Sequence, residues 1–160
     1  MIYIFEKMVI VMDKTTLCYI EKDDCYLMLY RNKKEVDINK GKWIGVGGHF
    51  EAEETADECL LREVFEETGL ILNSFRLRGE IVFYIDDIVE TSYLYTSNDF
   101  NGILKECDEG ILKWIPKREV LDLPLWEADP LFLKKLMADE PFFKMVLTYR
   151  NDKLISVKEE

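Results

Sequence analysis

The sequence is short of positive charge and contains a single histidine. Its 160 residues include 21 lysines and arginines against 32 aspartates and glutamates, so the formal net charge is −11. The phosphate backbone of a nucleic acid and an anionic membrane both repel such a chain, so we expect neither as its main partner. A small phosphorylated substrate is not excluded, because a bound divalent cation inverts the local charge.

Paired cysteine motifs and long apolar runs are also missing. Cys18, Cys25, Cys59 and Cys107 form no CxxC pair, so we expect reduced thiols in a cytoplasmic protein that fill the core rather than bind zinc. We also expect no signal peptide and no membrane span, because charged residues interrupt the apolar N-terminal run. Without repeats or linkers, the length fits one domain, residues 1–160.

The most informative stretch is the acidic segment 48–70, GHFEAEETADECLLREVFEETGL. Thr55 precedes Glu58 by three residues, which is the capping-box pattern at the start of a helix, and Gly69 supplies a stop. At about 100° per residue, three glutamates gather on one stripe of this helix and apolar side chains on the next. These glutamates are Glu63, Glu66 and Glu67.

A stripe of carboxylates destabilises a helix unless something neutralises it. Mg²⁺ is bound in proteins by a few carboxylates together with substrate phosphates. The run WIGVGG at 43–48 precedes the helix, and its glycines let the backbone approach a ligand or a metal closely. The two segments together therefore indicate a metal and phosphate site.

The remaining sequence predicts strands and two further helices. We expect strands at 16–30 (a hairpin around 22–24), 43–47, 75–85, 89–97, 111–115, 142–149 and 153–157. A helical turn is expected at 117–121, and a helix at 129–138 with Asp129 as its cap and Pro130 at its first position. Residues 31–42 and 98–102 are expected to be exposed loops. This order suits a mixed sheet with helices packed on it.

The acidic segment resembles the Nudix box, G-x5-E-x7-R-E-U-x-E-E-x-G-U, where U is aliphatic. The chain matches every specified position of that pattern, which makes the resemblance specific. The matching residues are Gly48, Glu54, Arg62, Glu63, Val64, Glu66, Glu67, Gly69 and Leu70. The resemblance implies the Nudix fold, an α/β/α sandwich around a mixed β-sheet. It also implies Mg²⁺ or Mn²⁺ as the cofactor and a nucleoside diphosphate linked to another group as the substrate.

The resemblance also implies roles for individual residues. The glutamates of the Nudix box, Glu63, Glu66 and Glu67, would bind the metal, together with the carbonyl of Gly47 and the carboxylate of Glu109. The catalytic candidates are Glu63, Arg62 and Glu66, and Arg62 would orient Glu63, which is also a candidate base. Which glutamate is the base stays open. Glu54 either binds an outer-shell water or holds the loop, and both roles stay open.

Three weaker similarities point to MutT-like enzymes that hydrolyse oxidised purine nucleoside triphosphates. The runs WIGVGGH (43–49), CDEGILKW (107–114) and LWEAD (125–129) resemble their W-x-G-x-G-G-K, S-D-E…W and W-P-D-D segments. The resemblance implies that Trp126 stacks on the base and Asp129 binds its edge, with Trp43 and His49 as further substrate contacts. The alternative for Trp126 is a core anchor. His49 has no histidine partner, so we expect a phosphate or loop contact rather than a metal ligand.

Two departures from that branch concern the base. Ile44 stands where good readers of the oxidised base have asparagine, and Ala128 replaces one of two adjacent aspartates. A hydrocarbon cannot hydrogen-bond to a base edge, so the prediction is a purine nucleoside triphosphatase more than an 8-oxo-dGTP diphosphatase. The alternatives are a Nudix pyrophosphatase for a sugar nucleotide or dinucleotide, and a non-catalytic nucleotide-sensing module. The expected oligomeric state is a monomer or a homodimer.

Overall fold

The computed structural model describes residues 2–5 and 8–160, and a mixed β-sheet is its largest feature. The described strands are β1 (Ile2–Phe5), β2 (Met8–Lys22), β3 (Cys25–Arg31), β4 (Trp43–Ile44), β5 (Val46–His49), β6 (Leu70–Ile85), β7 (Ile88–Gly102), β8 (Gly110–Pro116), β9 (Phe143–Arg150) and β10 (Lys153–Glu159). The helices in the same ranges are α1 (Ala56–Thr68), α2 (Lys117–Val120) and α3 (Asp129–Met137). None of these helices is long and apolar enough to cross a membrane.

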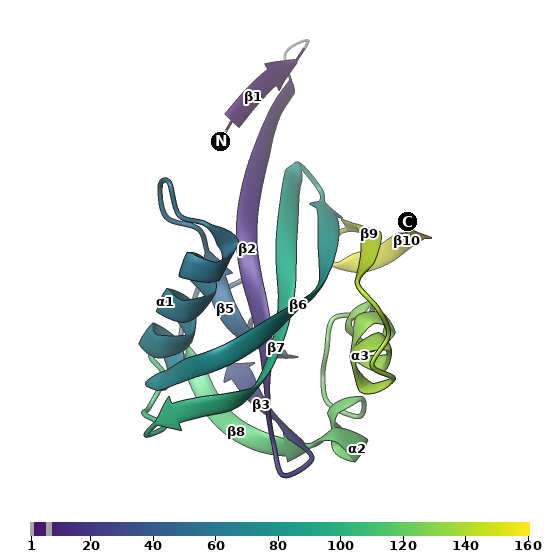
Figure 1. The fold of residues 1–160 in the computed structure, drawn as a ribbon. Coiled ribbons are helices and arrows are strands. Elements are labelled where there is room, and N and C mark those ends of the chain that lie inside the picture. Colours follow the sequence, from purple (N-terminus) through teal and green to yellow (C-terminus); the bar gives the residue numbers. More distant parts are fainter. Residues whose placement is uncertain (1, 6–7) are drawn as a thin grey trace.

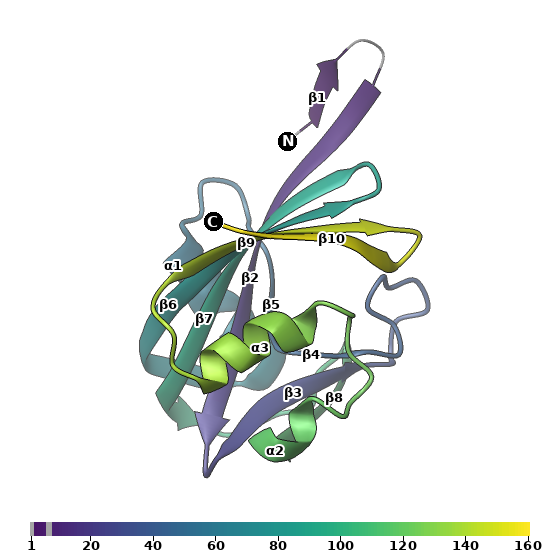
Figure 2. The ribbon, with the colours of Figure 1, turned by 90° about the vertical axis from the view of Figure 1, so that its right-hand side faces the viewer.

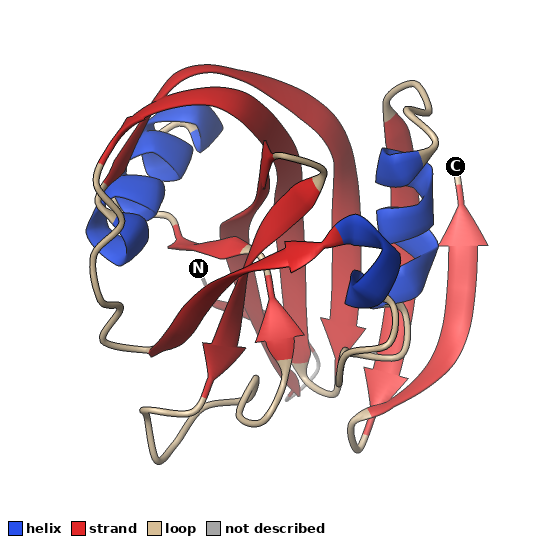
Figure 3. Ribbon diagram, turned by 90° about the horizontal axis from the view of Figure 1, so that it is seen from below, coloured by secondary structure: helices blue, strands red, loops and turns tan. Residues whose placement is uncertain are grey.

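The strands follow the order β10-β9-β6-β7-β2-β3-β4, while β1 and β5 also pair with β2, and β8 pairs with β3. The pairs β2–β7 and β6–β9 are parallel. The other named pairs within the described residues are antiparallel, so the sheet is mixed. Helix α1 lies on one side of the strands, and α2 and α3 lie on the other (Figures 1 and 3). The predicted fold class is confirmed.

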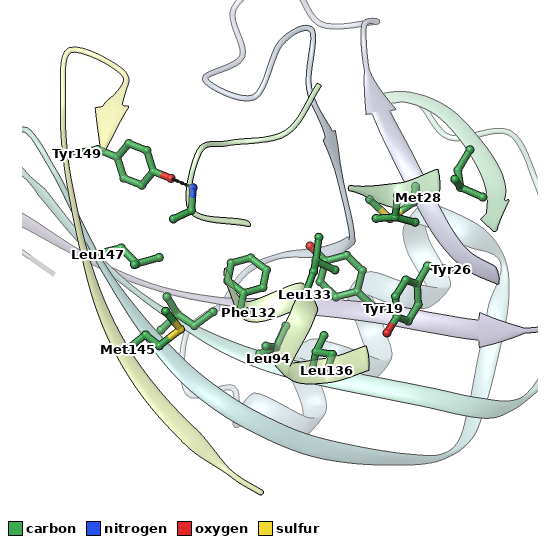
Figure 4. Close-up of a cluster of buried hydrophobic side chains, with 14 residues drawn as sticks. Tyr19, Tyr26, Met28, Leu94, Phe132, Leu133, Leu136, Met145, Leu147 and Tyr149 are labelled. Atoms are coloured by element: carbon green, nitrogen blue, oxygen red, sulfur yellow. Dashed lines mark hydrogen bonds between the residues drawn. The ribbon is translucent and has the colours of Figure 1, made fainter. Parts of the chain in front are cut away.

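Two hydrophobic clusters fill the space on the two faces of the sheet. Successive strand residues point to opposite faces, and Tyr19 on β2 lies in one cluster while its neighbours Cys18 and Ile20 lie in the other. Tyr19 contacts Phe132 of α3 with ring centroids 6.3 Å apart, and Figure 4 shows this side of the core. The other cluster packs against Leu60 and further buried residues of α1. Both faces of β2 are therefore buried where the helices cover it.

Local sequence signals account for the ends of α1 and for several turns. The Thr55 side chain accepts a hydrogen bond from the Glu58 N–H at 3.2 Å, and the Glu58 carboxylate accepts one from the Thr55 N–H at 3.2 Å. Gly69 ends the helix at a φ of 79°, in the left-handed region that favours glycine. The expected hairpin turns at 22–24 and around Asn151 are also present, with Asp23 and Asn151 at φ values of 50° and 51°.

Several expected boundaries are wrong. Strands β2 and β6 begin earlier than predicted, at Met8 and Leu70, because pairing with β1 and β7 extends them. Two further differences lie at 43–47 and 98–102. The single strand expected at 43–47 is divided at Gly45 into β4, which pairs with β3, and β5, which pairs with β2. A Cβ at Gly45 would lie 2.7 Å from the Cys18 carbonyl oxygen, so close backbone contact imposes this break. The loop expected at 98–102 is the end of β7, where Asn101 and Gly102 pair with the start of β6. Pairing with β6 outweighs the turn propensity of these polar residues.

The hairpin formed by β1 and the beginning of β2 extends away from the rest of the chain (Figure 2). Beyond this hairpin, β2 crosses the centre of the molecule and carries partners on both of its edges. This long strand therefore connects the elements that surround the cavity described next.

Candidate functional site

A cavity of about 630 Å³ opens on the α3 side of the sheet. Its walls include parts of strands β2, β5, β6, β7 and β9 and of the 31–39 segment, together with Glu63 of α1 and Asp129 at the start of α3. A volume of this size suits a ligand as large as a nucleotide. The cavity brings together two groups of side chains that are far apart in sequence.

Glu63 of α1 forms one end of the cavity together with Gly47 and Gly48 of β5. Its side chain is only 16% exposed. A Cβ on Gly48 would lie 2.5 Å from the carboxyl carbon of Glu63, so only glycine lets the helix carboxylate come this close to the strand. The strand that follows the predicted glycine run thus places its backbone directly against the carboxylate stripe.

Arg62 connects the acidic groups around this end. Its guanidinium donates to the Glu54 carboxylate at 2.7 and 2.8 Å, to Glu63 at 2.7 Å and to Glu66 at 3.1 Å. It also donates to the carbonyl of His49 at 3.0 Å. These contacts raise the pKa of Arg62 and lower the pKa of Glu54 to about 2. Arg62 therefore holds Glu63 in position relative to β5.

Glu54 holds the loop before α1 in place through hydrogen bonds. Besides binding Arg62, its carboxylate accepts a hydrogen bond from the Glu51 N–H at 3.0 Å. The geometry therefore matches the loop-holding role, one of the two left open by the sequence. The Glu54 carboxylate accepts three hydrogen bonds in these contacts, which leaves it less capacity for a bound water.

Glu67 is the buried member of the stripe, and one of its carboxylate oxygens, Oε2, has no hydrogen-bond partner among the described residues. Burial raises the pKa of Glu67 to about 9, with additional contributions from Glu109 and Glu63. Glu109 is itself bound by Arg31 at 2.7 Å and by Lys34 at 2.9 Å. A buried acid beside two other acids is a position that a bound cation would stabilise.

No three histidine, cysteine, aspartate or glutamate side chains in the described ranges converge as a metal-binding group. Arg62 provides a physical reason, because it holds oxygens of both Glu63 and Glu66. The donor set nevertheless fits a divalent cation. Glu67 offers an unpaired oxygen, Glu63 leaves one oxygen free of Arg62, and carboxylate oxygens are the ligands that Mg²⁺ and Mn²⁺ prefer.

Trp126 lies at the other end of the cavity, half-buried. Its indole N–H donates to the Asn39 side-chain oxygen at 2.8 Å, and Lys42 Nζ lies 4.7 Å from the ring centroid. Tyr149 packs against it in a T-shaped arrangement with ring centroids 5.3 Å apart. Trp126 therefore both packs at the border of the core and presents a surface to the cavity.

Asp129 lies beside Trp126 and is only 5% exposed. Burial raises its pKa to about 8, although the positive charge of Lys42 and the backbone N–H of Trp126 oppose this rise. At neutral pH the carboxyl group therefore holds a proton, so it can donate as well as accept a hydrogen bond. The predicted cap role is wrong, since Asp129 is the first helical residue and its carboxyl group faces the cavity.

Of the other predicted site residues, only some line the cavity. Trp43 packs on Tyr30 with ring centroids 5.1 Å apart and is not among the cavity-lining residues. Arg62, Glu66 and Glu67 are also not among the cavity-lining residues, and the Glu66 side chain is 55% exposed. His49 does line the cavity, and its Nδ1 is 4.0 Å from a carboxylate oxygen of Asp13.

The charged segment 31–42 forms one wall of the cavity, which was not predicted from the sequence. The segment is the largely exposed loop that the sequence predicts, but Arg31 donates to Asp37 at 2.7 Å and the Asp37 side chain is only 4% exposed. Asn39 continues this wall to Trp126. Opposite charges six residues apart, Arg31 and Asp37, are the one signal for a folded-back loop.

Comparisons with known proteins agree with this arrangement. Residues 13–136 match the NUDIX domain family. A protein from Bacillus subtilis (strain 168) named as an uncharacterised Nudix hydrolase is 27% identical over 144 residues, which are 86% of this chain and 87% of that protein. An oxidised purine nucleoside triphosphate hydrolase from Danio rerio is 29% identical over 110 residues, 64% of this chain and 69% of that protein. The crystal structure of a mutator MutT protein from Bacillus halodurans has a TM-score of 0.82 at 26% identity and covers 92% of this chain and 97% of that one.

Proposed function

This chain belongs to the NUDIX domain family of hydrolases that act on acid anhydrides, and on that premise we propose that it is a metal-dependent purine nucleoside triphosphate pyrophosphohydrolase. The products would be a nucleoside monophosphate and pyrophosphate. Oxidised purine nucleotides such as 8-oxo-dGTP are among the candidate substrates. The name of the Danio rerio relative supports the choice of a purine.

The observation that carries the proposal is the pairing of two chemistries in one cavity. Trp126 and Tyr149 offer aromatic surface at one end, and Asp129 offers a neutral acid next to them. Glu63 and the backbone of Gly48 lie at the other end. Aromatic rings bind the faces of bases, whereas carboxylates with a divalent cation bind phosphates. A nucleoside triphosphate satisfies both ends.

The base end favours purines without specifying one of them. Asp129 both donates and accepts, so it can pair with guanine-type and adenine-type edges. Ile44 lines the cavity and makes no hydrogen bond through its side chain, which removes one polar means of discrimination. We therefore expect several purine triphosphates to be accepted, with a modest preference among them.

The metal would be held by the carboxylates of Glu63, Glu66, Glu67 and Glu109 and by the carbonyl of Gly47. When bound, Mg²⁺ or Mn²⁺ neutralises charge on the phosphate oxygens and lowers the pKa of coordinated water. Glu63 is the candidate acceptor of the proton from the attacking water, and Arg62 keeps its carboxylate turned toward the cavity. Arg31 and Lys34 keep positive charge close to Glu109, at the same end.

We further propose that the chain acts as one Nudix domain over residues 1–160, as a monomer or homodimer in the cytoplasm. Its four cysteines are free thiols, which suits a reducing compartment. The net charge of −11 supports a small nucleotide substrate rather than a nucleic acid polymer or a membrane.

The test is a substrate panel assayed for pyrophosphate and monophosphate. Normal and oxidised purine triphosphates, pyrimidine triphosphates, sugar nucleotides and dinucleotides are each incubated with Mg²⁺, with Mn²⁺ and with a chelator. We expect metal-dependent release of pyrophosphate from purine triphosphates above the other classes. Turnover only of sugar nucleotides or dinucleotides would replace the proposal by a different Nudix activity. Binding without turnover would indicate a sensing module.

A further inference from the structure

The floor of the cavity changes character from one strand to the next. On β9 and β6 the lining residues Tyr149, Phe83 and Ile85 are apolar or aromatic. Register places Tyr149 next to Ile85 across β9–β6, and Phe83 next to Glu90 across β6–β7. From β7 onward most of the lining side chains are polar, with Ile88 on β7 and Leu17 on β2 as apolar exceptions. The change therefore runs along the strand order from the aromatic end toward the carboxylate end.

Five cavity-lining side chains make up this polar floor, which spans β7, β2 and β5. They are Asp13, Thr15, His49, Glu90 and Ser92. Register pairs Asp13 with Glu90 and Thr15 with Ser92 across β2–β7, and Thr15 with His49 across β2–β5. Paired residues on neighbouring strands lie about 5 Å apart. The five groups therefore form one continuous surface.

Ser92 has an unsatisfied hydroxyl on this surface. Its relative exposure is only 3%, it lines the cavity, and its hydroxyl forms no hydrogen bond with any described residue. Its oxygen is open to the cavity rather than enclosed, because it is not one of the fully buried unpaired side-chain atoms of the described residues. A ligand group that reaches the polar floor would supply the missing partner.

The charges on the polar floor restrict what that ligand group can be. Asp13 and Glu90 are adjacent acids, and the Glu90 carboxylate has one protein donor, the hydroxyl of Thr15. Two adjacent acids repel a phosphate, so the floor does not extend the phosphate site. Carboxylates accept hydrogen bonds from hydroxyl groups, and the Ser92 hydroxyl can donate or accept. A neutral group with several hydroxyls fits this surface.

The position of the polar floor identifies the group further. In a nucleoside triphosphate the sugar joins the base to the phosphates. In the cavity, the polar floor lies between the aromatic side chains of β9 and β6 and the Gly48–Glu63 contact beyond β5. The order of the strands thus repeats the order of the chemical parts of a nucleotide.

We propose that the polar floor binds the ribose of the substrate and engages both of its vicinal hydroxyls, so that the enzyme prefers ribonucleotides to 2′-deoxyribonucleotides. This inference rests on the proposed function, which places the base and the phosphates at the two ends. Two acids and a free serine hydroxyl offer more partners than a single 3′-hydroxyl can use. A site built to bind a hydroxyl discriminates against the analogue that lacks it.

The experiment compares kcat/KM for GTP with dGTP, and for ATP with dATP, in the wild-type protein and in Ser92→Ala. We expect the wild type to favour the ribonucleotide by at least about tenfold, because polar partners would be left unpaired by the deoxyribonucleotide. Ser92→Ala should lower this ratio by about 2- to 10-fold, the effect of one hydrogen bond. Glu90→Gln should lower it as well, since a charged acceptor is replaced by a neutral amide.

Thr91→Val is the matched control. Thr91 is the neighbouring residue on β7, faces the other side of the sheet and does not line the cavity, so the ratio should stay unchanged. A wild-type ratio near one, or an equal loss for both sugars in Ser92→Ala, would overturn the inference and leave the proposed function standing. If no triphosphate releases pyrophosphate, the proposed function fails. In that case the ratio of dissociation constants for GTP and dGTP, measured by calorimetry, tests the polar floor. The wild type should bind GTP more tightly, and Ser92→Ala should reduce this preference.

Discussion

The two ends of the cavity are built in different ways. The centre of the carboxylate end comes from one continuous stretch, in which β5 and α1 place Gly48 and Glu63 in contact, and Glu109 with Arg31 adds to it from elsewhere in the chain. The aromatic end joins Asn39, Trp126 and Tyr149, which come from three distant parts of the chain. On our proposal, a local helix and its preceding strand would hold the metal and the phosphates. The proposed base site, in contrast, depends on the packing of the whole sheet.

The two ends also differ in how they treat charge. At the carboxylate end the Arg62 guanidinium pairs with several carboxylates and lowers the pKa of Glu54 to about 2, although burial raises the pKa of Glu67 to about 9. At the aromatic end burial raises the pKa of Asp129 to about 8, so that group is neutral at pH 7. Changes at the first end should therefore affect turnover, and changes at the second should affect affinity and its dependence on base and pH.

The largest effect is expected from Glu63→Gln, which keeps the size of the side chain and removes its charge. We expect kcat to fall by at least about 100-fold, the typical loss when acid–base assistance is removed. The free energy of unfolding should change little, because Arg62 keeps its two contacts with Glu54. Steady-state kinetics in saturating Mg²⁺ and urea unfolding measure the two quantities.

Glu106→Gln is the control for this change, because Glu106 is exposed and does not line this cavity. It should behave as the wild type in both measurements. Near wild-type turnover in Glu63→Gln would remove Glu63 from the catalytic group and end the contrast between the two ends.

Trp126→Ala should act mainly on affinity. We expect KM for purine triphosphates to rise by a factor equivalent to about 1–3 kcal/mol, the range for stacking between a base and an aromatic ring. Its cost in unfolding free energy should be smaller than that of Phe132→Ala, for which about 3–5 kcal/mol is typical. Phe132 is fully buried, whereas Trp126 is half-exposed to the cavity. An unchanged KM together with a large loss of stability would make Trp126 a core residue only.

Asp129→Asn tests the neutral acid through the pH dependence of stability. In the unfolded chain the aspartate pKa is about 3.9, against about 8 in the folded protein. As the pH rises between these values, only the unfolded state loses the proton, so the acid's stabilising contribution decreases. We expect Asp129→Asn to reduce the loss of unfolding free energy between pH 5 and pH 8 by at least about 1.4 kcal/mol, the value of one pKa unit.

The same substitution should also change the ratio of kcat/KM between guanine-type and adenine-type triphosphates, because an amide has a fixed donor and a fixed acceptor, whereas an acid can carry its proton on either oxygen or lose it. Parallel pH curves of the two proteins would show that Asp129 is ionised in the folded state. A flat purine ratio would remove it from base recognition.

The smallest effect is expected from Asn39→Ala, which removes the acceptor of the Trp126 N–H. One neutral hydrogen bond contributes about 1 kcal/mol, so we expect a rise in KM of about fivefold or less with kcat unchanged. Asn32→Ala is the control, since Asn32 is an exposed residue of the same segment. A larger loss of kcat than of affinity would mean that the segment acts on the phosphate end instead.

What the sequence predicts well is local. The start and end of α1 follow from Thr55, Glu58 and Gly69, and the hairpin turns follow from aspartate and asparagine pairs that tolerate positive φ. These features depend on residues only a few positions apart, so periodicity and capping rules apply to them directly. The carboxylate stripe belongs to the same class.

The features that the sequence does not predict depend on contacts across the fold. Gly45 breaks a strand because of the Cys18 carbonyl, and Trp43 packs on Tyr30 rather than facing the cavity. Ser92 and Glu90 lie on the cavity side of β7, where alternation alone would place core residues. Each of these outcomes is set by a neighbouring strand or loop and has no local signal strong enough to reveal it.

The most direct test of the account is a crystal structure of the Glu63→Gln protein with a purine nucleoside triphosphate and Mg²⁺. This variant should bind the substrate and hydrolyse it slowly enough to be observed. The account predicts the base against Trp126 and beside Asp129, and the metal-bound phosphates between Gly48 and the carboxylates of α1. A nucleotide bound in the reverse direction, or outside this cavity, would contradict it.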